Sequence, residues 1–222
     1  MQTQPSNFDS QKQTQPLTFE EYVEIEEHNN QKYEYHDGYI VAMAGGTFYH
    51  SVICTNVQGK IWAILDDKDG TCQVVNSDAK LSIQIKNKYV YPDCMVICGY
   101  VEKNEEQKEA VTNPTVIIEV LSKSTAGSDR GDKFFAYKKI PSLQQYILIE
   151  QDKPQIDIYT RNKVVGESEE NMLWKIDRIE GLDSFLELTS IDIKVSLKSI
   201  YKNVEFPPLK EDEEKKDNEK NK

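Results

Sequence analysis

One stretch of this 222-residue chain restricts its possible folds more than any other: the string VIIEVL at residues 116–121. Five of its six residues are apolar, which is typical of a strand that is buried on both faces of a sheet. Such a strand needs a layer of helix or sheet on each side. The sequence therefore predicts a covered central sheet that carries one carboxylate, Glu119, within it.

Three longer helices are predicted that could supply these layers. Thr18 begins the first, and Glu21 completes a capping box with it. Apolar residues recur at helical spacing over residues 48–65, which predicts a long second helix. Asp129 is expected to cap a third helix that ends near residue 139, before Pro141. A short helix is also expected near residues 196–201.

Strands are predicted before and after the 116–121 run. Asp37 and Gly38 mark a tight hairpin turn between two β-prone segments. The other predicted strands lie at 72–77, 80–85, 93–99, 145–150, 155–161 and 173–179, with further β structure at 185–197. Together with the helices, this order predicts an α/β (α+β) fold with a mixed central sheet flanked by helices.

The chain is expected to form one domain between two tails. Residues 1–16 are rich in Gln, Ser, Thr and Pro, and residues 205–222 form a charge run, so both segments are expected to be disordered. The domain is then expected to span residues 17–204. The start of the chain has neither a basic segment nor an apolar core, and no apolar run reaches about 20 residues, so we expect a cytoplasmic protein without a membrane partner.

The net charge of −11 argues against tight binding to a nucleic acid, because phosphates are bound by Lys and Arg. The tails do not explain this charge, since the seven acids and five bases of residues 205–222 contribute only −2. Non-specific binding to DNA is therefore expected to be weak and to depend strongly on salt and on metal ions.

The cysteines and histidines show no metal-binding pattern. Cys94 and Cys98 lack a second pair, so all four cysteines (Cys54, Cys72, Cys94 and Cys98) are expected to be buried, reduced thiols, without a zinc site. His50 begins the long helix. It is either a helix cap or packed ring, or a proton shuttle or DNA contact.

Two carboxylates are the candidates for chemistry. Asp93 follows Pro92 at the start of the 93–99 strand, and Glu119 lies in the 116–121 strand. A buried carboxylate needs a compensating lysine or metal ion, although Glu119 could also face solvent at a strand end. If the two strands are neighbours, both carboxylates face one cleft, and two hard oxygen ligands suit Mg²⁺.

A lysine is expected to complete such a site. Lys133 has Asp129 four residues before it and Tyr137 four residues after it, so the three share one helical face. The alternative for Lys133 is a surface pair with Asp129. Lys123 is the rival lysine, because it lies four residues after Glu119 on the same strand face.

Two long strings carry a family resemblance. YPDCMVICG at residues 91–99 and NPTVIIEVLSKSTAGSDRGDKFFAYKKIPSLQQYILI at residues 113–149 resemble the Uma-two-type family of restriction-endonuclease-like proteins, within the PD-(D/E)XK nuclease superfamily. The resemblance covers about residues 17–202. It implies the restriction-endonuclease-like fold and hydrolysis of DNA phosphodiester bonds with Mg²⁺ or Mn²⁺.

The resemblance also implies roles for single residues. By motif position, Asp93, Glu119 and the backbone carbonyl of Val120 would hold the metal, with Lys133 as the catalytic lysine. The superfamily more commonly has this lysine two residues after the Glu, where this chain has Leu121. The residues expected to line the cleft are Glu34, Asp78, His50, Lys123 and Tyr137.

Two other functions stay open at this point. A catalytically inactive module with the same fold, binding nucleic acid or a protein partner, would suit the acidic chain and the missing strand lysine. A purely structural or assembly protein is the other. An active nuclease could be a homodimer, since cleavage of a duplex needs two cuts.

Overall fold

The computed structural model describes residues 13–29, 31–43, 45–68, 70–162 and 173–207. Most of the two predicted tails lies outside these residues, so the expected domain boundaries stay predictions. No helix in the described ranges is long and apolar enough to cross a membrane.

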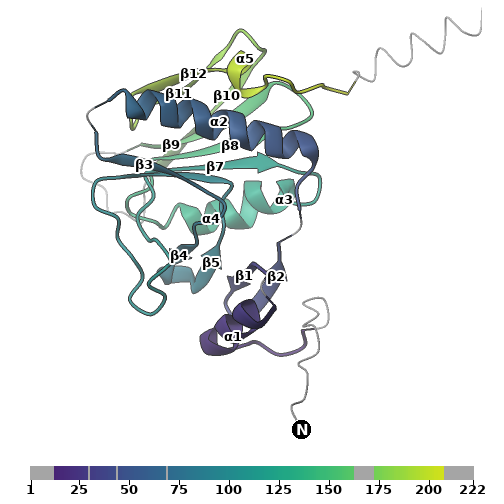
Figure 1. Cartoon of the computed structure of the whole chain (residues 1–222), viewed down its shortest axis with the longest axis vertical. Helices are drawn as coiled ribbons and strands as arrows, with labels where there is room; N and C mark the ends of the chain where they lie inside the picture. The colour runs from purple at the N-terminus through teal and green to yellow at the C-terminus, as the bar shows by residue number, and fades with distance from the viewer. Residues whose placement is uncertain (1–12, 30, 44, 69, 163–172, 208–222) are drawn as a thin grey trace, which may run out of the picture.

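A six-stranded mixed sheet forms the centre of the molecule (Figure 1). The strand order is β10-β9-β8-β7-β6-β3, in which β7 pairs in parallel with β8 and the other four pairings are antiparallel. The strands are β3 (Cys72–Asn76), β6 (Cys94–Cys98), β7 (Val116–Leu121), β8 (Gln145–Glu150), β9 (Gln155–Asn162) and β10 (Leu173–Glu180). The α/β prediction with a mixed sheet flanked by helices is confirmed.

Strand β7 is buried along its whole length, and its side chains alternate between two apolar cores. Val116, Ile118 and Val120 belong to one core, whereas Ile117 and Leu121 belong to the other. Because successive side chains of a strand point to opposite faces, Glu119 lies on the same face as Ile117 and Leu121. The face on which Glu119 lies decides which helix can reach its carboxylate.

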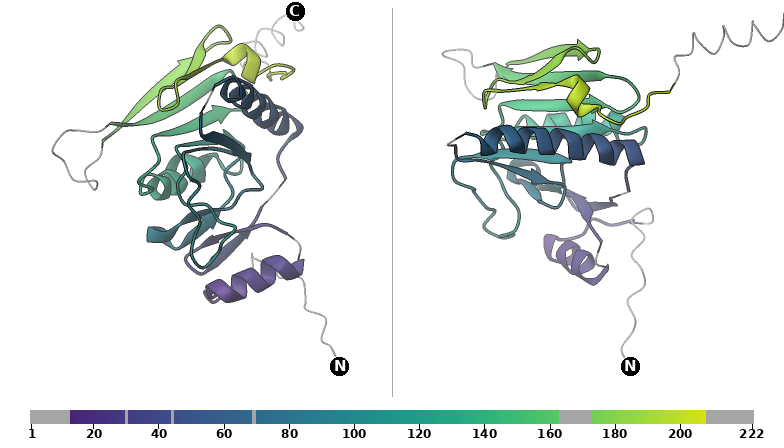
Figure 2. Two further views of the ribbon diagram at one scale, coloured as in Figure 1. Left: turned by 60° about the vertical axis from the view of Figure 1, so that its left-hand side comes forward. Right: turned by 45° about the horizontal axis from the view of Figure 1, so that its top comes forward.

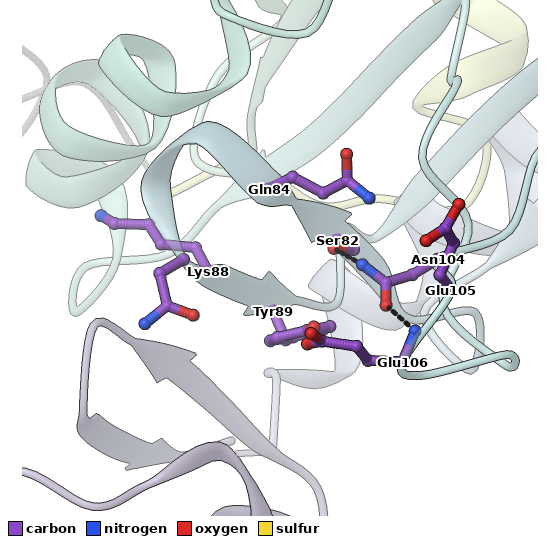
Figure 3. Close-up of a pocket in the computed structure, with 8 residues that line it drawn as sticks. Ser82, Gln84, Lys88, Tyr89, Asn104, Glu105 and Glu106 are labelled. Carbon is purple, nitrogen blue, oxygen red and sulfur yellow. Dashed lines mark hydrogen bonds between the residues drawn. The ribbon is translucent and has the colours of Figure 1, made fainter.

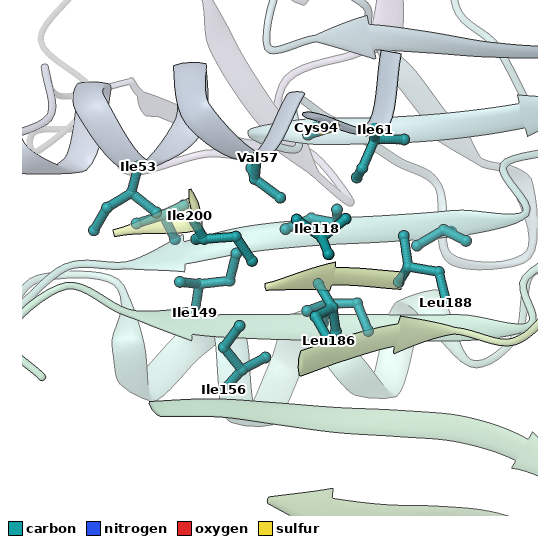
Figure 4. Packing of buried hydrophobic residues seen from close by; sticks show 14 of the residues in the cluster. Ile53, Val57, Ile61, Cys94, Ile118, Ile149, Ile156, Leu186, Leu188 and Ile200 are labelled. Atoms are coloured by element: carbon teal, nitrogen blue, oxygen red, sulfur yellow. The ribbon is translucent and has the colours of Figure 1, made fainter. Parts of the chain in front are cut away.

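Helix α2 (Phe48–Asp66) covers the Ile118 face of the sheet. Its buried residues Ile53, Val57 and Ile61 recur every four positions and point toward β7 and β8 in Figure 4. Complete burial of each such side chain stabilises the fold by about 1.5–3 kcal/mol. The small sheet of β11 (Phe185–Leu188) and β12 (Ile193–Ser196), followed by α5 (Leu197–Ile200), packs into the same core.

The Glu119 face is covered by a helical segment between β7 and β8. It consists of α3 (Ala126–Ser128), a π-helical turn η3 (Asp129–Lys133) and α4 (Phe134–Tyr137). The predicted start of this helix at Asp129 is wrong, because helical structure begins at Ala126 and Asp129 is buried within it. The cap position at Thr125 therefore leaves the Asp129 carboxylate free to face inward.

A smaller layer is built from the first helix and a second sheet. It contains α1 (Phe19–Asn29) and four strands in the order β2-β1-β5-β4, namely β1 (Tyr33–His36), β2 (Tyr39–Ala42), β4 (Leu81–Ile83) and β5 (Lys88–Val90). The capping box is confirmed, with Thr18 N–H 2.8 Å from Glu21 Oε2 and Glu21 N–H 3.2 Å from Thr18 Oγ1. Figure 2 shows α1 at the opposite end of the molecule from α5.

Two further details differ from the sequence predictions. The strand predicted at 80–85 ends after Ile83 in a short 3-10 turn (Gln84–Lys86), and β5 was not predicted. The expectation of reduced cysteines is wrong for Cys72 and Cys98, which form a disulfide. The two residues lie directly opposite each other in the β3–β6 register, so their side chains are adjacent.

Candidate functional site

Asp93 and Glu119 lie next to each other because β6 and β7 are neighbours in the central sheet. Asp93 directly precedes β6, and its backbone N–H donates to Glu119 Oε2 over 3.2 Å. In return the Val120 backbone N–H donates to Asp93 Oδ2 over 2.8 Å. The two backbone donors hold the carboxylates side by side, as expected if the strands are adjacent.

Lys133 joins three carboxylates from three different elements. Its Nζ lies 3.1 Å from Glu119 Oε1, 3.2 Å from Glu34 Oε1 and 3.3 Å from Asp129 Oδ1. The Lys133 side chain is only 11% exposed, and that of Asp129 only 2%. The alternative of a surface pair between Lys133 and Asp129 is therefore wrong, because the pair is buried.

Tyr137 adds a second donor to the same carboxylate. Its hydroxyl donates to Glu119 Oε1 over 2.9 Å and is buried. Asp129, Lys133 and Tyr137 contact one another or Glu119 from a single helical segment, which agrees with their predicted common face. This segment fixes the orientation of the Glu119 carboxylate from the face of the sheet that it covers.

Negative charge exceeds positive charge at this centre. Three acids (Glu34, Glu119 and Asp129) share the ammonium of Lys133, and a fourth, Asp93, lies beside Glu119. Burial raises the pKa of Glu119 to about 8, against the lowering effect of Lys133 and together with the charges of the other three acids. The three acids around Lys133 raise the pKa of its ammonium although burial opposes this, so Lys133 is charged.

The donor set of the centre fits a divalent cation. Carboxylate oxygens are the ligands that Mg²⁺ prefers, and a bound cation would offset the excess negative charge. Asp129 Oδ1 is buried and accepts no hydrogen bond from the described residues, although Lys133 Nζ lies nearby. Burial raises the pKa of the Asp129 carboxyl as well. The site is thus strained electrostatically in a way that a cation would relieve.

His50 lies on the other side of Asp93, at the start of α2. Its Nε2 is 3.2 Å from Asp93 Oδ2, and this contact raises the pKa of the imidazole against the effect of burial. Thr47 provides the helix cap by accepting from the His50 backbone N–H. At Gly46 an added Cβ would lie 2.6 Å from His50 Nδ1, so glycine lets the chain approach the ring closely.

A cavity of about 690 Å³ brings most of these groups to one surface. Its lining includes Glu34, His50, Asp93, Glu119, Val120, Asp129 and Lys133. Lys123 also lies on its wall, with an exposed side chain, and Tyr137 lies behind Glu119. Of the predicted cleft residues, Glu34, His50 and Lys123 thus line the cavity, whereas Tyr137 and Asp78 do not.

Asp78 lies outside this cavity, on the surface of the protein. Its side chain is 75% exposed and forms an ion pair with Lys32. The expectation that Asp78 lines the cleft is therefore not met by its position. A second, smaller cavity of about 280 Å³ is lined by Ser82, Tyr89, Asn104 and their neighbours (Figure 3), and no predicted catalytic residue contributes to it.

Two residues near the centre were missed by the sequence reasoning. Asp129 was predicted to share the helical face of Lys133, but only as a helix cap or as a surface partner of that lysine, so its burial against Lys133 was missed. Cys54 was treated as a core thiol, yet its Sγ lies 3.6 Å from His50 Nδ1. The i,i+4 spacing of His50 and Cys54 on a predicted helix was the signal for that contact.

Comparisons with known proteins bear on the family and the fold of this chain. The Uma2 family, described as "Putative restriction endonuclease", matches residues 19–190. Two proteins of Synechocystis sp. (strain ATCC 27184 / PCC 6803 / Kazusa) are similar over most of their length. "Uncharacterized protein slr1290" is 36% identical over 190 residues, which is 86% of this chain and 94% of that protein. "Uncharacterized protein sll1609" is 33% identical over 180 residues, 81% of this chain and 97% of that protein.

One solved structure shares the fold. It is described as a "putative nuclease belonging to DUF820" from Anabaena variabilis ATCC 29413, and it aligns with a TM-score of 0.66 at 16% sequence identity. The alignment covers 84% of this chain and 98% of that one. The central sheet and its helical layers are therefore a shared architecture.

Proposed function

This chain belongs to the Uma2 family, and from that premise we propose that it is a metal-dependent endonuclease that hydrolyses phosphodiester bonds of DNA. The observation that carries the proposal is a group of four acids on the wall of a cavity of about 690 Å³, of which Glu34, Glu119 and Asp129 contact Lys133 and Asp93 lies beside Glu119. Carboxylate oxygens are the ligands that Mg²⁺ prefers, and the description of the family supports a nuclease.

Asp93 and Glu119 are the proposed metal ligands for Mg²⁺ or Mn²⁺, with the backbone carbonyl of Val120 as a third. When bound, the ion supplies neutralisation of phosphate charge and a lower pKa for a coordinated water. Val120 N–H and Asp93 N–H hold the two carboxylates in place. Tyr137 restrains Glu119 from the helix side, so the ligands are arranged before an ion arrives.

Lys133 is the proposed catalytic lysine, and it acts from the helix rather than from strand β7. Its ammonium borders the cavity and is held by Glu119, Glu34 and Asp129. Negative charge develops on the phosphate oxygens during hydrolysis, and a fixed ammonium beside them stabilises that charge. Leu121, at the commoner lysine position, is buried in the core and cannot serve.

A second candidate function is a module with the same fold that binds nucleic acid or a protein partner without catalysis. The net charge of −11 favours the protein-binding form of this module, because an acidic surface repels a polyanion such as DNA. Arg130 also pairs with Glu150 and Asp157, so it adds little free positive charge near the helix.

A plasmid-nicking assay with a panel of divalent metals separates the two functions. We expect nicking by the full-length chain with Mg²⁺ or Mn²⁺, none with a chelator, and at least a 100-fold slower reaction in Asp93→Asn and Glu119→Gln. Asp78→Asn is the matched control, because Asp78 is an exposed acid outside the cavity, and it should cleave normally.

The outcome that overturns the enzyme proposal is equally definite. A folded native chain that cleaves neither DNA nor RNA with any metal, and gains no thermal stability from Mg²⁺, would be an inactive module. Equal cleavage by Glu119→Gln and the native chain would contradict the assignment of the metal ligand.

Two further expectations accompany the proposal. An enzyme that cuts both strands of a duplex needs two sites, so we propose a homodimer, which sedimentation velocity tests directly. A cytoplasmic location, where DNA and Mg²⁺ are both available, is the expected compartment.

A further inference from the structure

A second set of metal-binding groups lies beside the proposed Mg²⁺ site. His50 and Cys54 occupy successive turns of α2 on one helical face, and Asp93 faces them from the start of β6. One ligand atom of each residue lies within 4.8 Å of the others. Among the described residues this is the one such group of three.

The chemistry of this group differs from that of Asp93 with Glu119. Mg²⁺ takes oxygen ligands, whereas zinc and similar ions bind an imidazole nitrogen, a thiolate and a carboxylate together. We infer that His50, Cys54 and Asp93 form a site for a thiophilic divalent cation of the zinc class, with its fourth position open toward the cavity.

The distances in the group suit a shared ion. His50 Nε2 is 3.2 Å from Asp93 Oδ2, and His50 Nδ1 is 3.6 Å from Cys54 Sγ. Ligand atoms on a tetrahedral zinc ion, with bonds of about 2.0–2.3 Å, stand roughly 3.3–3.8 Å apart. These two distances run to different nitrogens of the ring, and an ion binds only one of them, so the three ligand atoms, which lie within 4.8 Å of one another, must draw closer together to share an ion.

Cys54 is available for this role because it is a free thiol. The disulfide uses Cys72 and Cys98, and Cys54 is half-buried at the base of the His50 ring. Burial and the charge of Asp93 raise the pKa of the Cys54 thiol, so it carries a proton in the absence of a cation. Binding forms a sulfur–metal bond, breaks the S–H bond and releases that proton to solvent.

Asp93 belongs to both sets of ligands, which gives the second site a consequence. A thiophilic ion that occupies Asp93 removes a ligand from Mg²⁺, so zinc-class ions are expected to inhibit Mg²⁺-dependent cleavage. This consequence rests on the proposed function, whereas the site itself does not.

Cobalt spectroscopy of the full-length chain tests the site, since Co²⁺ reports thiolate ligation by a sulfur-to-metal charge-transfer band. We expect the native chain, with its disulfide intact, to show this band and to lose it when Zn²⁺ is added. Cys54→Ser should lose the band and bind Zn²⁺ at least 10-fold more weakly in calorimetry. Cys94→Ser is the matched control, because Cys94 is the other free cysteine and is outside the group, and it should keep the band.

Glu119→Gln separates this proposal from the proposed function. The variant lacks a proposed Mg²⁺ ligand but keeps His50, Cys54 and Asp93, so it should retain the cobalt band. If the native chain shows the cobalt band but never cleaves DNA, the site of His50, Cys54 and Asp93 is supported and the proposed nuclease function is contradicted.

Absence of the band in the native chain, or an unchanged band in Cys54→Ser, overturns the proposal. If Cys54→Ser does not fold, the native chain is treated with a thiol-alkylating reagent instead, with and without Zn²⁺. Bound Zn²⁺ should protect Cys54 from alkylation, and equal labelling under both conditions contradicts the site.

Discussion

Glu119 is a carboxylate with 3% of its surface exposed in the middle of an apolar strand, and the groups around it explain how it is tolerated. Lys133 Nζ, Tyr137 O–H and Asp93 N–H all donate to its two oxygens. An unpaired buried carboxylate would destabilise the fold by several kcal/mol. The compensation is incomplete, however, because Lys133 serves three acids at once.

Lys133→Met is predicted to destabilise the protein by about 3–5 kcal/mol at pH 7, since it leaves the buried acids Glu119 and Asp129 and the partly buried Glu34 without their cation. The loss should be smaller at pH 5, where those carboxylates take up protons more readily. Urea unfolding in the presence of a chelator measures both values. Lys139→Met is the control, because Lys139 is exposed, and equal midpoints for the two variants would contradict the prediction.

The pKa of Glu119 predicts how stability depends on pH without metal. Burial raises this pKa from 4.5 to about 8 in the folded chain, so the folded state binds the Glu119 proton more tightly than the unfolded state. Its contribution to stability is therefore fully present below pH 4.5 and is lost as the pH rises toward 8. Glu119→Gln should flatten the fall in unfolding free energy over this range, and an unchanged slope would count against it.

At the residue scale, the sequence alone predicted Asp93, Glu119 and Lys133 correctly as neighbours. An acid within VIIEVL has few ways to be tolerated, so its need for a cation follows from elementary solvation. The inward orientation of Asp129 could not be predicted. It depends on a helix that is capped at Thr125, four residues before the cap that the sequence indicated.

At the element scale, the site depends on β6 and β7 being neighbours and on the helical segment that follows β7. Antiparallel pairing of Cys94 with Ile118 brings Asp93 beside Glu119. The π-helical turn η3 then directs Asp129 and Lys133 toward Glu119. Such turns are frequent at functional sites, and no residue pattern in this chain indicated one.

The disulfide between β3 and β6 contradicts the prediction that all four cysteines are reduced. Cys72 and Cys98 are 26 residues apart, and their pairing depends on the register between β3 and β6, which could not be predicted from the sequence. Without a known register, four cysteines in a chain of this kind indicate reduced thiols.

Reduction of this disulfide is predicted to lower the free energy of unfolding by about 3 kcal/mol, because the closed loop restricts the unfolded chain. Urea unfolding with and without a thiol reductant measures the change. A Cys72→Ser, Cys98→Ser double variant should have the same free energy of unfolding as the reduced native chain, and the reductant should not change it. No difference between oxidised and reduced native protein would contradict the prediction.

At the scale of the whole molecule, the proposed catalytic groups gather at one cavity while the chain as a whole carries a net charge of −11. DNA phosphates are repelled by such a surface unless a cation lies between them and the carboxylates. The cavity therefore accounts for substrate binding only with its metal in place, and the metal is the central claim of this account.

Mg²⁺ binding tests that claim most directly, through the thermal stability of the full-length chain. At a Mg²⁺ concentration of 100 times its Kd, binding to the folded state adds about 2.7 kcal/mol to stability. We predict a saturable rise in melting temperature for the native chain and for Asp78→Asn, and none for Asp93→Asn or Glu119→Gln. A native chain that Mg²⁺ does not stabilise, or an equal rise in Glu119→Gln, would contradict the account.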